Sequence, residues 1–258
     1  MVSRREFVSG VGGATVGFFG STMVLNKGVS KSVKKRVESA TGQNVTVDVK
    51  LFPTDEFLGM GRKGVMNATY AIETLLPGLS NSKLDVSTNV TTSTTIVTEA
   101  SLNWGGSNEL TVIRDRLTGD SSITLASDSN IVLSSYQHPD DKIGIAEIPD
   151  NQESSVGAIF DSGGTLTNST QSSVSGTGSR NLYLRTLAHE IGHNLGLTHA
   201  DANAWIENEY MVSTIMANKS RLNYGGKNNF GQKIPDKGDF LHYRQAPVWN
   251  RRINRVLV

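Results

Sequence analysis

The sequence predicts a mixed α/β (α+β) fold, and two observations lead to this fold class. A β-rich segment near residue 45 is followed by a long amphipathic segment, then by several short β-rich segments and a second helical segment. The length of 258 residues suits one sizeable domain, and no segment repeats along the chain. The order of the elements leaves an irregular region at the end of the chain.

The first predicted strand and helix are neighbours in the sequence. Residues 45–52 alternate and are rich in β-branched side chains, which is typical of a strand, and Pro53 ends it. Thr54 offers an N-cap side chain. Apolar residues then recur at helical spacing over residues 57–76, and a Pro-Gly pair closes this predicted helix.

The later elements are shorter. Residues 84–126 contain Thr- and Val-rich pieces separated by turn sequences, so short strands and turns are expected there. The remaining expectations are strands at 131–136, 143–148 and 156–160, a polar loop at 161–180, and helices at 181–194 and within 239–258.

The chain begins with a segment unlike the rest. Arg4 and Arg5 precede a weakly apolar, glycine-rich run at residues 8–25. This arrangement resembles a twin-arginine export signal, which implies export to the cell exterior or surface by the twin-arginine machinery of an archaeal or bacterial cell. An uncleaved N-terminal membrane anchor is the alternative, but a short run with so many glycines makes a poor membrane span.

Composition excludes several classes of function. The formal net charge is +1 and no basic block dominates the body of the chain, so no nucleic-acid partner is expected. The chain has no cysteine, which excludes disulfides, thiolate zinc sites, cysteine nucleophiles and iron–sulfur clusters. Metal ligands must therefore come from His, Asp, Glu or Tyr.

One motif, HEIGHNLGLTH, carries the predicted chemistry. His189 and His193 are four residues apart, so on a helix both imidazoles project from one face and can reach one ion. Gly196 can adopt the left-handed conformation that ends a helix, which lets the chain turn and His199 supply a third nitrogen. Three imidazoles leave a fourth position open, as a catalytic zinc ion requires.

Glu190 is the predicted general base of this site. It lies one step round the helix from His189, where it can hold a metal-bound water. Because zinc lowers the pKa of such a water to about 7, Glu190 is expected to take its proton and pass it to the leaving amine. One catalytic Zn²⁺ is the predicted cofactor, and further structural Ca²⁺ or Zn²⁺ ions are not assigned to residues.

The motif HExxHxxGxxH is the signature of metzincin metallopeptidases, and this chain matches it at every fixed position. The resemblance covers both adamalysin-like and matrixin-like features, so no branch is assigned. It implies a twisted mixed sheet, an active-site helix and a small irregular C-terminal subdomain ending in a helix. We divide the chain into an export signal or anchor (1–28), a linker (29–43) and a catalytic domain (44–258), whose upper and lower subdomains span about 44–196 and 197–258.

Metzincins also have a Met-turn beneath the zinc site. Met216, which follows His199 by 17 residues, is the expected Met-turn residue, and Met211 is the fallback. Asp201 is expected to support the lower subdomain structurally. Some branches place a tyrosine near the metal, and Tyr224 is the candidate for that role.

Three other side chains have more than one interpretation. Glu209 can act as the downstream glutamate of an HExxH site, as in gluzincins, but His199 with Gly196 explains more of the motif. His138 is expected in a solvated turn, and a second metal site is its alternative. His242 is expected to be a surface or packing residue.

Substrate is expected to bind at an edge strand. In metzincins such a strand pairs with an extended peptide, which holds the main chain of any sequence. Residues 131–136 and 143–148 are both candidates for this edge. Asn-x-Ser/Thr sequons, which accept glycans if the chain is exported into a suitable host, occur at Asn44, Asn67, Asn89, Asn168 and Asn218.

The sequence therefore predicts an exported zinc-dependent endopeptidase that acts as a monomer on protein or peptide substrates. Two alternatives stay open. One is a catalytically silent surface-binding protein that keeps zinc for stability, and the other is a zinc hydrolase acting on a non-peptide bond. Glu190 favours an enzyme, because a metal ion kept for stability needs no base beside its ligands.

Overall fold

The computed structural model of the chain describes residues 44–79, 85–102, 104–106, 108–148, 154–169, 182–207, 209–218, 221–228, 232–239, 242–246 and 249. The predicted export signal (1–28) and linker (29–43) lie outside these residues. In the described ranges, none of the helices has both the length and the hydrophobicity that a membrane crossing requires.

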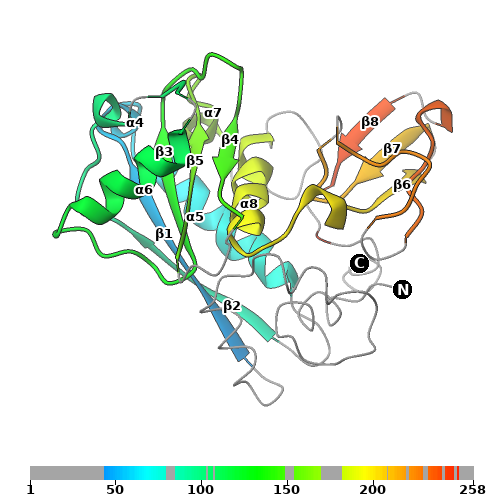
Figure 1. The fold of residues 1–258 in the computed structure, drawn as a ribbon, viewed down its shortest axis with the longest axis horizontal. Coiled ribbons are helices and arrows are strands. Elements are labelled where there is room, and N and C mark those ends of the chain that lie inside the picture. The colour runs from blue at the N-terminus through cyan, green and yellow to red at the C-terminus, as the bar shows by residue number, and fades with distance from the viewer. Residues whose placement is uncertain are drawn as a thin grey trace.

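A five-stranded mixed sheet is the centre of the fold (Figure 1). Its strands are β1 (Asn44–Pro53), β2 (Asp85–Thr92), β3 (Ser129–Ser134), β4 (Gly144–Ala146) and β5 (Ser155–Phe160). They lie in the order β2-β1-β3-β5-β4, and all pairs are parallel except β4 with β5. β4 is therefore an antiparallel edge strand.

Helices cover both faces of this sheet. Ile131 and Leu133 of β3 pack on one face with the helices α5 (Lys63–Leu75) and α8 (Leu182–Asn194). Val132, between them in the strand, packs on the other face with α6 (Glu109–Gly119). Strands buried on both faces have continuous apolar sequences, as the IVL of β3 does. The mixed α/β fold class predicted from the sequence is confirmed.

The helix predicted over residues 57–76 is two helices, α4 (Asp55–Gly59) and α5, followed by the 3₁₀ turn η1 (Leu76–Leu79). Gly61 lies between them with a φ of +116°, a conformation that interrupts a right-handed helix. The predicted N-cap is confirmed, because Thr54 Oγ1 accepts a hydrogen bond from the backbone N–H of Phe57 at 3.1 Å.

The prediction that residues 84–126 contain only strands and turns is wrong in part. β2 is a strand, but Glu109–Gly119 form α6, and Glu99–Ser101 form the 3₁₀ turn η2. The β-branched residues of α6 suggested a strand, whereas its buried residues Ile113 and Leu117 are four positions apart and face the sheet together. Packing has overridden the local preference.

A second, three-stranded sheet follows the active-site helix. It consists of β6 (Ala204–Glu207), β7 (Tyr210–Ser213) and β8 (His242–Gln245), with β6 antiparallel and β8 parallel to β7. Figure 1 shows α8 between the two sheets. Short elements complete the fold: α7 (Thr165–Asn168), η5 (His199–Asp201) and η6 (Lys237–Asp239).

Two predictions in the second half of the chain need correction. The helix expected within 239–258 is wrong over His242–Gln245, because these residues pair with β7 and satisfy their backbone groups there. Residues 250–258 lie outside the described part. The loop expected at 161–180 contains the short helix α7, and residues 170–181 lie outside the described part.

Candidate metal centre

The helix α8 carries two of the motif histidines, and its packing fixes where they point. Leu184, Leu187 and Ile191 are buried in the core shared with the sheet, so His189 and His193 project from another side of the helix. The end of the helix is anchored as well. The buried Asn194 amide, oriented to donate to Val156 O and Glu147 O at 3.0 Å, ties α8 to the sheet.

Gly196 ends the helix in the way the motif predicts. Its φ is +92°, in the left-handed region where a Cβ atom is disfavoured. Its backbone N–H donates to His193 O at 2.8 Å, and that of Leu197 donates to Gly192 O at 2.8 Å. These bonds satisfy the last carbonyls of α8 and reverse the chain, which brings His199 at the start of η5 back to the helix.

The three histidines form one cluster. Their ligand nitrogens all lie within 4.8 Å of one another. His199 Nε2 lies 3.1 Å from His189 Nε2 and 3.3 Å from His193 Nε2. On the far side of the rings, His189 Nδ1 contacts Ile215 O and His193 Nδ1 contacts Leu197 O, each at 2.7 Å. Because a carbonyl oxygen only accepts, both Nδ1 atoms carry the proton and both Nε2 atoms present lone pairs.

This arrangement fits a zinc ion. A proton on His199 Nε2 can satisfy only one of the two lone pairs that face it, whereas a cation between the rings satisfies all three nitrogens. Tetrahedral zinc with Zn–N bonds of about 2.0–2.1 Å requires neighbouring nitrogens about 3.3 Å apart, close to the two separations from His199 Nε2. The donor set, three imidazoles with carbonyls behind two of them, is one that zinc prefers.

The electrostatics keep the three rings ready to bind a metal. Burial, together with the charge of His189, lowers the pKa of His193 to about 3 and that of His199 to about 4. Burial also lowers the pKa of His189. Since metal ligands must be deprotonated, these neutral imidazoles lose few protons when a cation binds.

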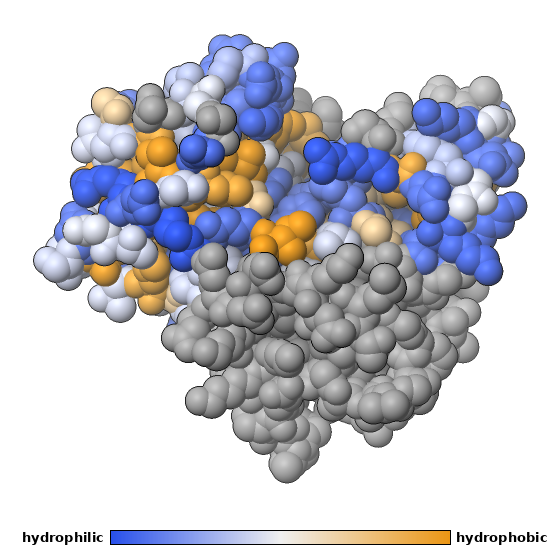
Figure 2. All heavy atoms as spheres, viewed as in Figure 1, coloured by the Kyte–Doolittle hydropathy of each residue, from blue (hydrophilic) through white to orange (hydrophobic). Residues whose placement is uncertain are grey.

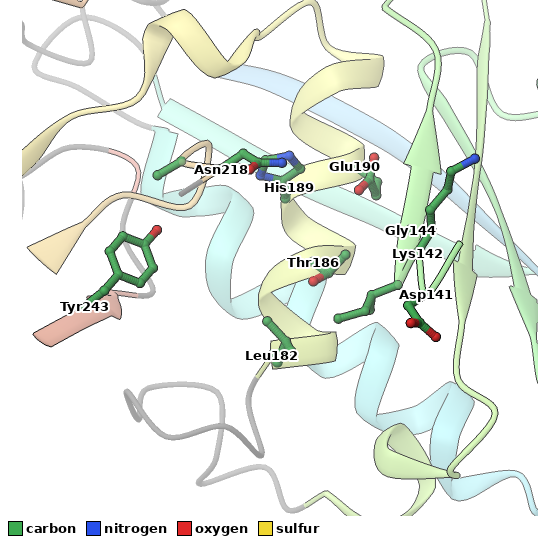
Figure 3. Close-up of a pocket in the computed structure, with 11 residues that line it drawn as sticks. Asp141, Lys142, Gly144, Leu182, Thr186, His189, Glu190, Asn218 and Tyr243 are labelled. Carbon is green, nitrogen blue, oxygen red and sulfur yellow. The ribbon is translucent and has the colours of Figure 1, made fainter. Parts of the chain in front are cut away.

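Glu190 points from α8 toward the edge strand β4 (Figure 3). It is buried, and burial raises the pKa of its carboxyl to about 8, an effect that a cation held by the histidines would oppose. Gly144 of β4 faces it directly. A Cβ atom on Gly144 would lie 2.8 Å from both Cγ and Oε1 of Glu190, so the glycine leaves the space that this carboxylate occupies.

Met216 lies against the active-site helix. It is 2% exposed, and a Cβ atom placed on Gly192 of α8 would lie only 2.5 Å from its sulfur. The preceding residue, Ile215, supplies the carbonyl behind His189. Met211, the fallback, is buried in β7. It shares with Met216 what we call the lower apolar cluster, which consists of Leu197, Ala202, Ala204, Met211, Met216, Ala217, Leu222 and Ile234. The segment around Met216 thus supports both the helix and the first histidine.

The other residues predicted from the sequence lie on several elements of the second half of the chain. Asp201 ends the turn η5 that begins with His199. Glu209 is exposed beside the β6–β7 hairpin and does not belong to the histidine cluster. Tyr224 packs against the apolar cluster that contains Met211 and Met216, beneath Lys237, and burial raises its pKa. His242 begins β8, and its side chain is outside the described part.

The prediction of a solvated turn for His138 is wrong. The ring is 2% exposed and packs on Phe160. Its Nε2 atom lies 2.5 Å from Glu109 Oε1. Its Nδ1 accepts the backbone N–H of Asp140 at 3.0 Å, so Nε2 carries the proton that reaches Glu109. The partner lies on α6, which the sequence did not predict. Within the described ranges, the three histidines are the one group of side chains placed to hold a metal ion. We therefore assign no residues to further ions.

The cleft runs along β4, which identifies residues 143–148 as the edge and residues 131–136 as an interior strand. Two pockets meet at His189, Glu190 and Gly144. The Tyr243 pocket, of about 370 Å³, extends past Leu182, Thr186 and Tyr243 (Figure 3). The Arg221 pocket, of about 710 Å³, extends past Ile148, His199 and Arg221. In Figure 2 the apolar surface of this face gathers over α6 and β4.

The sequence did not point to several residues of this cleft, among them Lys142, Gly144, Arg221 and Tyr243. No motif marks them, because strand order and the second sheet bring them to the histidines. Tyr243, on β8, is the tyrosine that lines the cleft instead of Tyr224, and its Oη lies 2.8 Å from Ser213 Oγ. One sequon is also unusable in the fold, since the buried Asn67 amide donates to Leu166 O and Ser169 O.

Comparison with known proteins agrees with the geometry of the centre. Residues 79–200, just under half of the chain, match the family model described as "Metallo-peptidase family M12B Reprolysin-like". This region contains all three clustered histidines. The family match and the histidine cluster together fit a metzincin-like zinc peptidase. No curated protein matches the sequence of this metzincin-like peptidase.

Two solved structures are similar to this metzincin-like peptidase. One is described as "Structure of a chaperone-substrate complex" (TM-score 0.40, 16% identity), where 76% of this chain is covered. The chain spans about a third of that structure's length, 33%. The other is an archaemetzincin from Methanopyrus kandleri (TM-score 0.38, 17% identity), with 82% of this chain and 93% of that chain covered.

Proposed function

We propose that this metzincin-like peptidase is an exported, monomeric zinc-dependent endopeptidase whose general base is Glu190. The observation that carries the proposal is the position of Glu190, between the histidine cluster and the edge strand β4. The cleft continues on both sides of Glu190, toward Leu182 and toward Ile148. A cleft that continues on both sides of Glu190 accommodates a chain that extends in both directions from the scissile bond, which favours cleavage inside a protein over removal of a terminal residue.

Different residues of the cleft are proposed to bind the substrate, hold the metal ion and transfer the proton. No described strand pairs with the outer edge of β4, so its backbone can hold an extended peptide by main-chain hydrogen bonds, with little dependence on the peptide sequence. His189, His193 and His199 would hold zinc, which when bound supplies a Lewis acid and makes water nucleophilic at neutral pH. Glu190 would accept the proton of the attacking water and deliver it to the nitrogen of the leaving amine.

The export part of the proposal rests on Arg4 and Arg5 ahead of the glycine-rich run, which lie outside the described residues. A fusion of residues 1–30 to a reporter that functions only after folded export tests it. We expect export by a twin-arginine system and its loss when both arginines become lysines. Export that survives this change would contradict the twin-arginine route.

The catalytic part is tested by comparing the full chain with Glu190→Gln. The wild type is expected to cleave quenched casein, and peptides blocked at both ends, until a zinc chelator is added. Glu190→Gln should retain about one zinc per chain but lose about 10³-fold in kcat, since only proton transfer is removed. Rates and metal content by mass spectrometry are measured together.

The matched control is Glu209→Gln, at the exposed glutamate beside the β6–β7 hairpin, which should keep both zinc and activity. If wild type and Glu190→Gln both hold zinc and neither cleaves any peptide, the peptidase proposal fails. A surface-binding protein or a hydrolase of a non-peptide bond would then explain the metal centre.

A further inference from the structure

The Arg221 pocket has an uneven distribution of charge. Apart from the three histidines, its charged lining residues are Lys142, Arg221 and the buried base Glu190. Lys142 is already neutralised, because its Nζ lies 3.3 Å from Glu109 Oε2 and 3.4 Å from Asp140 Oδ2. In the described part of the chain, none of the ion pairs involves Arg221. Arg221 is therefore the one cationic side chain of this pocket that forms no ion pair with a described carboxylate.

Arg221 lies close to the metal centre, because it lines the same pocket as His189, His193 and His199. A positive charge beside a site for a divalent cation is unfavourable by itself. A negatively charged group of a bound substrate would remove this repulsion and gain an attraction to the guanidinium.

The backbone at Arg221 is tied to the wall of the cleft. Its N–H donates to Asn218 O at 2.9 Å, and Asn218 lines both pockets. Asn218 follows Met216 and Ala217, which are buried in the lower apolar cluster. Three larger apolar side chains, Leu110, Ile145 and Ile148, also line this pocket. The side chain itself is exposed to solvent, so it can be reached by a ligand.

We propose that Arg221 is a specificity-determining residue that recognises a carboxylate of the bound peptide in the Arg221 pocket. The proposal rests on the proposed function, since it names the substrate class of the same cleft: peptides with an acidic side chain near the scissile bond. A guanidinium binds a carboxylate through paired N–H donors, which an amide of the same shape cannot reproduce. The free carboxylate of a peptide C-terminus offers the same chemistry.

A binding experiment tests the proposal without requiring turnover. The full chain with Glu190→Gln, loaded with zinc, is titrated against labelled peptides blocked at both ends that differ only in Glu or Gln at each position. Fluorescence anisotropy at low ionic strength gives the Kd. Because Arg221 is exposed, we expect the best Glu peptide to bind about fivefold more tightly than its Gln partner. This ratio should shrink at high salt.

Variants assign the effect to one side chain. Arg221→Gln should bring the Glu/Gln ratio to about one, and Arg221→Glu should favour a Lys peptide over the Glu peptide. Arg62→Gln, at an exposed arginine that lines neither pocket, should leave the ratio unchanged. A further pair of Gln peptides, one with a free C-terminus and one amidated, shows whether the recognised carboxylate is a side chain or a chain end.

Equal Kd values within both peptide pairs, a ratio that survives Arg221→Gln, or no measurable binding of any peptide would overturn the proposal. Failure of the proposed function gives a different result. If the wild type cleaves no peptide but the Arg221-dependent ratio is present, carboxylate recognition stands and catalysis does not. If blocked peptides are cleaved with no preference that depends on Arg221, the endopeptidase stands and this inference fails.

Discussion

At the scale of single residues, glycines decide how closely the parts of the centre approach one another. Gly144 leaves room for the Glu190 carboxylate on the β4 side, and Gly192 leaves room for the Met216 sulfur on the other side of α8. Neither glycine has a positive φ, so each is required by space and not by backbone conformation. The position of the Glu190 side chain therefore depends on Gly144, a residue 46 positions earlier in the chain.

Gly144→Ala tests this requirement. The new Cβ would lie 2.8 Å from Cγ and Oε1 of Glu190 and 2.9 Å from Thr186 Cγ2, so the carboxylate must move away from β4. Because small misplacements of a catalytic group are costly, we expect kcat to fall about 10–100-fold with zinc content unchanged. Gly119→Ala is the control, since nothing lies within 4 Å of a Cβ there. Full activity of Gly144→Ala would show that Glu190 does not need its present position.

At the scale of elements, α6 holds the segment that leads into the edge strand. Glu109 of α6 contacts His138, Lys142 and the backbone N–H of Gly105, the last at 2.8 Å. His138 and Lys142 flank the turn that precedes β4. A buried carboxylate with these partners connects the helix on one face of the sheet to the strand that borders the cleft.

Acidification is expected to weaken this connection. Burial alone would raise the pKa of Glu109, but the hydrogen bonds from His138 and Gly105 and the charge of Lys142 lower it below its ordinary value. A carboxyl with a lowered folded-state pKa adds stability above its unfolded pKa, about 4.3, and this stability is lost as the pH falls through the folded value. Glu109→Gln should therefore lower the free energy of unfolding by about 1–2 kcal/mol at neutral pH.

The measurement is urea denaturation of wild type and Glu109→Gln from pH 7 downward. The difference between them should be constant above about pH 5 and shrink below it, as the wild-type carboxyl becomes neutral like the amide. Glu73→Gln, at an exposed side chain of α5, should not change the free energy of unfolding at neutral pH. A Glu109→Gln difference that persists undiminished at pH 3 would contradict this account.

At the scale of the whole molecule, the metal centre joins two differently built parts. His189 and His193 belong to α8, which packs in the core of the five-stranded sheet, whereas His199 begins the lower part with its three-stranded sheet. Figure 1 shows α8 where these parts meet. The chain has no cysteine and so no disulfide, and an ion held by all three histidines would cross-link these two parts.

Removing the ion should consequently destabilise the protein. A ligand at about 1,000 times its Kd stabilises the folded state by about 4 kcal/mol, so we expect a chelator to lower Tm by about 10 °C and added zinc to restore it. His199→Ala should lose most of this response, and Glu190→Gln should keep it, because only the first removes a ligand. Calorimetry with and without zinc provides the values. Equal Tm values for zinc-loaded and chelated wild type would show that the ion does not link the two parts.

The sequence by itself determined what depends on local spacing. The i, i+4 placement of His189 and His193, the glycine that ends α8 with a φ of +92°, and the strand patterns of β1, β3 and β5 are set by residues close together in the chain. The zinc chemistry followed from the same eleven residues, because donor type and helical period are local properties.

Only the tertiary structure decided what depends on contacts between distant segments. Strand order made β4 the edge and β3 an interior strand, and sheet packing turned Glu109–Gly119 into a helix. Pairing with β7 made His242–Gln245 a strand and brought Tyr243 to the cleft, and burial gave His138 a partner on α6. Burial and hydrogen bonding between segments far apart in sequence set these outcomes, and their free energies override weak local preferences.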